Sequence, residues 1–193
     1  IILALELIVQ AATPITHAQG VKVLFASLTG DIMLDALVGA LFAMISYSSL
    51  AAVLLTATLA GAEVISLPVA IGLVVGANIG SGLLAFISTS MQNAAGRRVA
   101  LGSLLYKLIG LLLIIPVLHP LVGWMDSLSF SPQELVIGFH LLYNTLRCLI
   151  MLPTVKPMGR LCNTLLPERE NGNGQIRPRH LHTSALETPS LAL

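Results

Sequence analysis

The chain has 193 residues, of which 55% are hydrophobic and only 10% are charged, and its mean hydropathy is +0.89. Soluble domains carry roughly a quarter charged residues, so this composition excludes an ordinary soluble domain. The net charge of +1 gives no electrostatic basis for binding nucleic acid.

The first 31 residues divide into an apolar part and a mixed part. Residues 1–12 are apolar and begin without a methionine, so we expect the end of a membrane helix whose start lies upstream. Residues 13–31 mix apolar residues with Pro14, His17 and Lys22, which predicts a loop or a segment at the membrane interface.

Residues 32–60 are almost free of charge after Asp35 and are longer than one bilayer thickness. Ser46-Tyr47-Ser48-Ser49 interrupts them. Three serines within four residues cannot share one face of a helix, so the cluster favours an unwound segment where hydroxyls converge. Two alternatives stay open at this point: one long span, or a re-entrant hairpin of two half-helices.

Residues 67–90 carry glycines at 72, 76, 80 and 82, together with Asn78 and Ser81. Taken alone, the spacing of Gly72, Gly76 and Gly80 is typical of close helix packing. The amide of Asn78 needs partners in the membrane, however, and a serine cluster precedes the stretch. We therefore expect a helix break near Gly80 that exposes backbone N–H groups for an anion and carbonyls for a cation.

Residues 98–118 and 134–152 are the clearest predicted spans, with a polar loop at 119–133 between them. Basic residues precede the first of these two spans and follow the second. Under the positive-inside rule, these residues and the tail are cytoplasmic, and the loop at 119–133 and Glu63 are outside. The basic residues concerned are Arg97, Arg98, Lys156, Arg160, Arg169, Arg177 and Arg179.

Four of the polar side chains inside these two spans are candidates for a functional role. Lys107 lies deeper than Arg147, which is close enough to the cytoplasmic end to extend toward the interface. His140 and Asn144 are four residues apart and share a helical face. We expect Lys107, His140 and Asn144 to form a supporting polar face directed into the protein.

Residues 167–193 are polar and are predicted to be a cytoplasmic linker, which follows a membrane domain over residues 1–166. His180 and His182 lack a third ligand nearby, so we expect no transition-metal site. No nucleophile–base pair or paired carboxylates occur in the predicted spans, and we therefore expect no enzyme.

These residues resemble the sodium/phosphate cotransporter family. Its members carry two inverted repeats, each with a Gln-Ser-Ser-Ser motif at a helical break and a Gly-Ala-Asn-Ile-Gly-Thr-Thr stretch downstream. Here Ser46-Tyr47-Ser48-Ser49 and Gly76-Ala77-Asn78-Ile79-Gly80-Ser81-Gly82 match these motifs. His140-Leu141-Leu142-Tyr143-Asn144 is similar to the family's His-x-x-Phe-Asn pattern. The resemblance covers residues 30–155.

The resemblance implies an all-α, multi-pass integral membrane protein with re-entrant or broken helices, of which this chain is the second repeat. It implies sodium-dependent phosphate transport by alternating access in a bacterial inner membrane, with Na⁺ as the coupling ion and no other cofactor. Phosphate would contact Ser48, Ser49 and Ser81, and Na⁺ would contact Ser46, Ser48, Ser49 and Asn78. The implied partners are phosphate, Na⁺, membrane lipid and a first repeat, and the linker would lead to a helical regulatory domain.

The chain departs from the family motifs at Ser46, Tyr47, Ser81 and Gly82, which replace a glutamine, a serine and two threonines. Some ligands of the typical site are thereby lost from this repeat. Transport direction and oligomeric state stay open. The alternatives are another Na⁺/anion cotransporter, a membrane scaffold whose glycines and serines serve only packing, and a membrane phosphatase.

Overall fold

The computed structural model describes residues 31–167 together with Leu7, Gln10 and Gln19. All regular structure over residues 31–167 is helical, which confirms the predicted all-α class. Apart from Leu7, Gln10, Gln19 and Asp31, the predicted segments 1–12 and 13–31 lie outside the described residues, as do the tail from 168 onward and His180 and His182.

The segment 32–60, for which the sequence left one long span or a re-entrant hairpin open, forms two short helices. These are α3 (Ile32–Ile45) and α4 (Ser49–Gly61). Asp31 caps α3, since its carboxylate accepts hydrogen bonds from Met33 N at 2.9 Å and Leu34 N at 3.1 Å. At 14 and 13 residues, these helices are about 20 Å long, and neither reaches across a ~30 Å hydrocarbon core. The structure therefore favours two half-helices over one long span.

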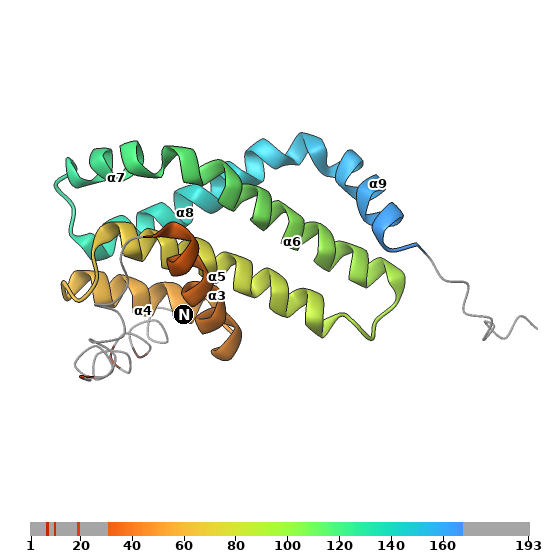
Figure 1. Cartoon of the computed structure of the whole chain (residues 1–193), viewed down its shortest axis with the longest axis horizontal. Coiled ribbons are helices and arrows are strands. Elements are labelled where there is room, and N and C mark those ends of the chain that lie inside the picture. The colour runs from red at the N-terminus through yellow and green to blue at the C-terminus, as the bar shows by residue number, and fades with distance from the viewer. Residues whose placement is uncertain (1–6, 8–9, 11–18, 20–30, 168–193) are drawn as a thin grey trace, which may run out of the picture.

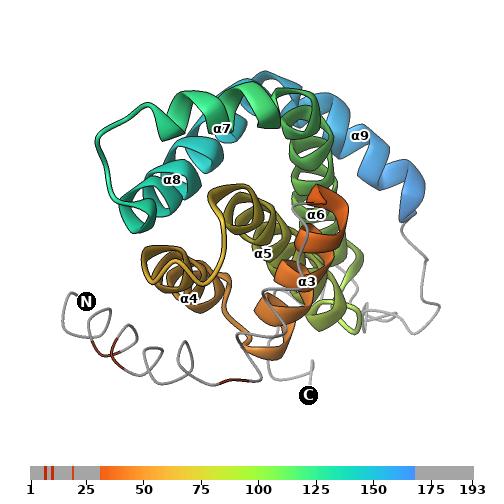
Figure 2. The same ribbon diagram turned by 60° about the vertical axis from the view of Figure 1, so that its left-hand side comes forward.

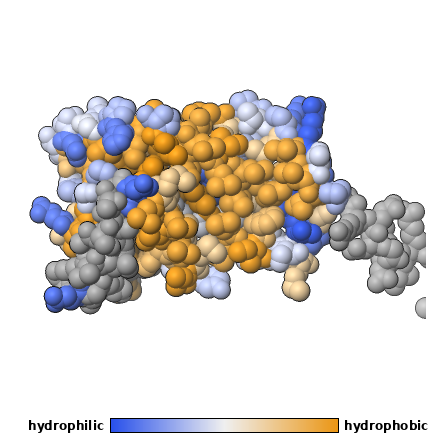
Figure 3. All heavy atoms as spheres, viewed as in Figure 1, coloured by the Kyte–Doolittle hydropathy of each residue, from blue (hydrophilic) through white to orange (hydrophobic). Residues whose placement is uncertain are grey.

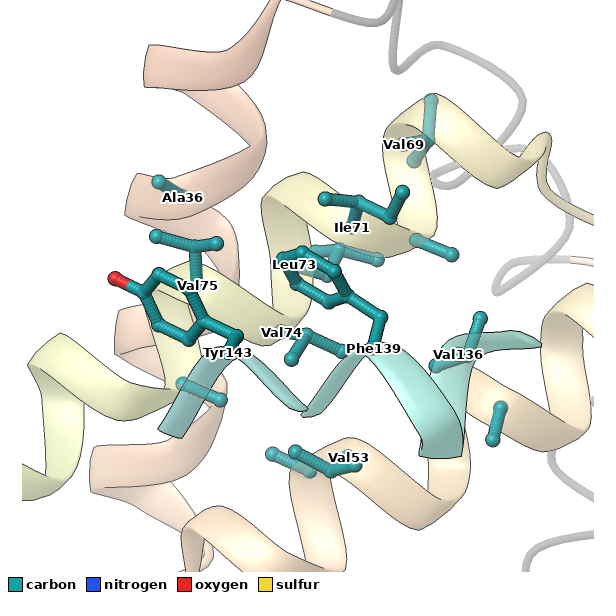
Figure 4. Close-up of a cluster of buried hydrophobic side chains, with 14 of the residues drawn as sticks. Ala36, Val53, Val69, Ile71, Leu73, Val74, Val75, Val136, Phe139 and Tyr143 are labelled. Carbon is teal, nitrogen blue, oxygen red and sulfur yellow. The ribbon is translucent and has the colours of Figure 1, made fainter. Parts of the chain in front are cut away.

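Helix α5 (Leu67–Ser88) is the central element. It packs against α3, α4, α6 and α8, and Figure 2 shows it enclosed by them. Its residues from Val69 to Gly80 are all buried. In the core, Val74 of α5 meets side chains of α4 and α8 (Figure 4). Val53, Val136 and Phe139 belong to this cluster.

Helix α6 (Ala94–Ile114) passes through a short 3₁₀ turn, η1 (Ile115–Val117), into α7 (Leu118–Asp126). The predicted polar loop at 119–133 is therefore wrong over its first half. Pro120 occupies the first turn of α7, where the missing N–H has no helical partner to lose, so the proline does not prevent the helix. The connection without helix is confined to residues 127–131.

Helix α8 (Pro132–Met151) begins with a capping box, in which Ser131 Oγ accepts from Glu134 N at 3.3 Å while Glu134 Oε2 accepts from Ser131 N at 2.8 Å. It continues through η2 (Leu152–Thr154) into α9 (Val155–Leu165), which packs on α6. The spans predicted at 98–118 and 134–152 are confirmed by the helical run Ala94–Asp126 and by α8.

Within the described residues, three helical runs are long and apolar enough to cross a membrane: Leu67–Ser88, Ala94–Asp126 and Pro132–Leu165. They lie roughly along the long axis of the molecule (Figure 1). On the face shown in Figure 3, apolar residues form a broad central band and hydrophilic residues gather toward both ends. This distribution fits a protein whose middle is surrounded by lipid.

Candidate functional site

The predicted helix break at the serine cluster is confirmed. Helix α3 ends at Ile45 with Ser46 as its C-cap, Tyr47 adopts a positive φ of 52°, and Ser48 caps α4. Ser48 Oγ accepts a hydrogen bond from Ala51 N at 3.1 Å, and Ser46 Oγ donates to Phe42 O at 2.8 Å. A non-glycine residue with positive φ is uncommon, so the turn holds its backbone in a demanding conformation.

This turn lies partway along the length of the apolar helix α5. Helix α4 runs antiparallel to α5 and ends beside the start of α5 (Figure 1). Because α4 has 13 residues, its first turn is about 20 Å from that end of the molecule. Helix α5 reaches Ser81 after a similar number of residues, 14 beyond Leu67, so Ser48, Ser49 and Ser81 lie at about the same depth.

The predicted helix break near Gly80 is wrong, because α5 is continuous from Leu67 to Ser88. The glycines instead form the seam between α5 and α3. A methyl group at Gly76 would overlap the Ala36 carbonyl, and one at Gly80 would overlap the Ala40 carbonyl. Close backbone approach is what small residues at four-residue spacing provide between membrane helices. No half-helix therefore begins at residue 81.

The side-chain N–H group of Asn78 finds its hydrogen-bond partner within α5, since Nδ2 donates to Val74 O at 3.1 Å. This local bond explains how a buried asparagine is compatible with an unbroken helix. Ser81 Oγ donates to Asn78 O at 2.7 Å and accepts from Lys107 Nζ at 2.8 Å. The structure thus joins two of the predicted site residues, Ser81 of α5 and Lys107 of α6.

A second polar group runs along α8. Asn144 Nδ2 donates to His140 O at 2.7 Å and lies 3.2 Å from His140 Nδ1, and Arg147 Nη2 donates to Asn144 Oδ1 at 2.7 Å. The guanidinium also lies over the Tyr143 ring, 5.5 Å from its centroid. The expectation that His140 and Asn144 share a face is confirmed.

A cavity of ≈ 530 Å³ between α6, α8 and α9 links the two polar groups, because Lys107 and Arg147 both line it. Gly110 of α6 provides room for the side chains of Tyr143 and Arg147. Ser46, Ser48 and Asn78 do not line this cavity. Among the described residues, no hydrogen bond joins the serine turn to Ser81, Lys107 or His140.

Sequence reasoning missed Asp35, which is 0% exposed. Neither of its carboxyl oxygens has a hydrogen-bond partner among the described residues. The available signal was a carboxylate inside an apolar segment, since an ionisable residue at membrane depth generally indicates function. Within the described part of the chain, no group of three or more His, Cys, Asp or Glu residues is arranged to hold a metal ion.

The model of the Na⁺/Pi-cotransporter family matches residues 1–149. The chain belongs to this family. The match includes the serine turn, the glycine seam and the His140–Asn144 pair, which are the features that the resemblance rested on. The three apolar helical runs of the described residues agree with a membrane protein.

Curated relatives of this cotransporter segment include YjbB of Escherichia coli K12 and of Salmonella typhimurium, 64% and 63% identical over the whole chain. Both are named as candidate inorganic phosphate export proteins. The chain spans 36% of the length of these relatives. The uncharacterized protein YqeW of Bacillus subtilis is 26% identical over 133 residues, covering 69% of this chain and 43% of the relative. No solved structure matches.

Proposed function

We propose that this chain is the second repeat of a sodium-coupled inorganic phosphate transporter that works by alternating access. The observation that carries the proposal is the pair of half-helices meeting at Ser46-Tyr47-Ser48 at membrane depth, in a chain of the Na⁺/Pi-cotransporter family. Discontinuous helices at the midplane are where secondary transporters bind substrate and coupling ions.

Phosphate would bind at the first turn of α4. Ser48 and Ser49 offer hydroxyls there, and the first N–H groups of a helix have no partner within it. The positive end of the helix dipole adds to their attraction for an anion. Ser81 lies at about the same depth, and its hydrogen-bond partner Lys107 supplies the positive charge that a phosphate requires.

Na⁺ would bind to oxygens at the carboxyl end of α3. The Ser46, Ser48 and Ser49 hydroxyls are hard oxygen ligands, and the last carbonyls of a helix have no helical donor. Asn78 could contribute its side-chain oxygen, because only its Nδ2 is engaged by Val74. A cation beside the anion reduces the net charge that has to cross the membrane, which couples the two movements.

The direction of transport follows from the sum of the two gradients, since a coupled carrier is reversible. The names of the YjbB relatives favour efflux of phosphate. The start of α6, with Arg97 and Arg98, and α9, with Lys156 and Arg160, lie at the opposite end from the α7–α8 connection between Asp126 and Glu134 (Figure 1). Under the positive-inside rule, this puts the α9 end in the cytoplasm, and we propose a multi-pass protein of the bacterial inner membrane.

The full-length parent protein, reconstituted in proteoliposomes, tests this proposal through the flux of radiolabelled phosphate with Na⁺ or choline. We expect flux with Na⁺ and its loss in the Ser48→Ala/Ser49→Ala double variant. Lys107→Met should weaken the apparent phosphate affinity about tenfold or more, because it removes a hydrogen bond from a charged group.

Two matched variants serve as controls. Ser90→Ala changes an exposed serine in the α5–α6 connection, and Lys156→Met changes an exposed lysine on α9; both should transport like the wild type. Phosphate flux that is equal with Na⁺ and with choline would contradict the proposed mechanism. Wild-type flux in the Ser48→Ala/Ser49→Ala double variant would contradict it as well. Competition by sulfate or a dicarboxylate as strong as that by phosphate would instead favour another Na⁺/anion cotransporter.

A further inference from the structure

Asp35 is a fully buried ionisable group that the proposed sites do not use. It lies in the second turn of α3, where Gly72 of α5 leaves room for its side chain. A methyl group built at Gly72 would stand 2.6 Å from Asp35 Cβ and 3.3 Å from Asp35 Oδ2. The carboxyl is 0% exposed, and both of its oxygens lack a hydrogen-bond partner among the described residues.

No charge of opposite sign faces this carboxyl from the helices packed on α3. Helices α4 and α5 contain no titratable residue. Asp31 precedes α3 as its N-cap, one turn before Asp35, and its negative charge opposes ionisation of Asp35. An ionised carboxylate buried without a partner is far more costly than a neutral acid. The described arrangement therefore favours a bound proton.

The seam around Asp35 is suited to movement. Helix α3 meets α5 backbone to backbone: Gly39 lies against the Leu73 backbone, and Ala36 and Ala40 lie against glycines of α5. Sliding of packed helices past one another is a common form of conformational change. A small shift of α3 along α5 would change the surroundings of Asp35 without unpacking a large core.

We propose that Asp35 carries a proton in the transport cycle, holding it while α3 and α5 are packed as described and releasing it when the seam opens. In the release step the O–H bond of the carboxyl breaks, the proton passes to water, and the carboxylate left behind is free to attract a monovalent cation. The idea rests on the proposed transport function and adds a proton-linked step to it.

The test measures phosphate flux and proton movement together, using full-length protein in proteoliposomes that contain a pH-sensitive dye. We expect the wild type to move protons with phosphate and Asp35→Asn to lose one proton per phosphate. Both proteins are compared at the same pH, so the protonation of phosphate itself is identical. Asp31→Asn is the matched control, because asparagine preserves the helix cap, and it should retain wild-type proton movement.

An infrared difference spectrum, recorded on phosphate addition, gives a second readout that does not need transport. A carbonyl band of a protonated carboxyl should be present in the wild type and in Asp35→Glu, and absent in Asp35→Asn. If Asp35→Asn does not fold, the wild-type band and its frequency shift in Asp35→Glu decide the question.

The outcomes separate this inference from the transport proposal. Absence of phosphate flux in the wild type would refute transport itself. Normal flux with unchanged proton movement in Asp35→Asn would overturn the proton-carrying role alone. A wild-type difference spectrum without a protonated carboxyl band would also overturn it, because the proposed release of the proton has to change that band.

Discussion

Gly76 and Asp35 show how much the contacts of a single residue depend on the opposite helix. Gly76 is covered by the backbone of α3 at Ala36, and Asp35 is covered by the bare backbone of α5 at Gly72. The four-residue spacing of the glycines made close helix packing one of two interpretations of the sequence, the other being a helix break near Gly80. The sequence around Asp35 does not predict what surrounds its carboxyl group, because the neighbouring helix determines how deeply that group is buried.

At the residue scale, Gly76→Ala tests the seam. The added methyl group would overlap the Ala36 carbonyl, so α3 has to move away, at a cost of roughly 1–3 kcal/mol. The measurement is thermal unfolding of the full-length protein in detergent.

Gly138→Ala is the matched control, because a methyl group there meets nothing within 4 Å on α8. It should leave stability unchanged or raise it by about 0.5–1 kcal/mol, as expected for alanine in place of glycine within a helix. Equal effects of the two variants would show that α3 and α5 are not in close contact.

At the scale of the elements, the α3–α4 break combines a local and a proposed functional role. Ser48 caps α4 through its hydroxyl, and the same hydroxyl is a proposed ligand. Three serines in four residues indicated an unwound segment correctly. For α5, by contrast, the same type of reasoning predicted a break that does not exist, because Asn78 and Ser81 bond to carbonyls of their own helix.

Substitutions at Ser48 can separate these two roles. Ser48→Ala should destabilise the protein by about 1 kcal/mol through loss of the cap, whereas Ser48→Gly should cost only a few tenths of a kcal/mol. Both variants lose the hydroxyl, so both should lose Na⁺-dependent phosphate flux if it is a ligand. Thermal unfolding and flux are measured on the same preparations. A Ser48→Gly protein with wild-type flux would limit Ser48 to capping.

At the scale of the whole molecule, the chain separates its charges between two ends. Asp126 and Glu134 lie at the α7–α8 end, and Lys156 and Arg160 belong to α9 at the other (Figure 1). This arrangement follows from the alternating direction of α5, the α6–α7 run and α8. Under the positive-inside rule, this separation of charge between the two ends predicts the orientation of the protein in the membrane.

Accessibility of single cysteines checks this orientation. Asp126→Cys and Lys156→Cys, each in full-length protein with its native cysteines replaced by serine, place a thiol at opposite ends. A membrane-impermeant thiol reagent should label Asp126→Cys in intact spheroplasts and Lys156→Cys only after the membrane is permeabilised. The reverse pattern would invert the proposed topology, and labelling of both in intact spheroplasts would contradict a multi-pass arrangement.

The sequence by itself determined the membrane class, the two spans at 98–118 and 134–152, the break at the serine cluster and the His140–Asn144 pair. These depend on composition and on contacts between residues close in the chain, which periodicity and helix chemistry report directly. Only the tertiary structure decided that α5 is continuous, that Lys107 reaches Ser81, and that Asp35 is buried with no hydrogen-bond partner among the described residues. Helix α5 stays continuous because Asn78 and Ser81 bond to its own carbonyls. The other two depend on which helix lies opposite, and spacing within one helix does not encode that.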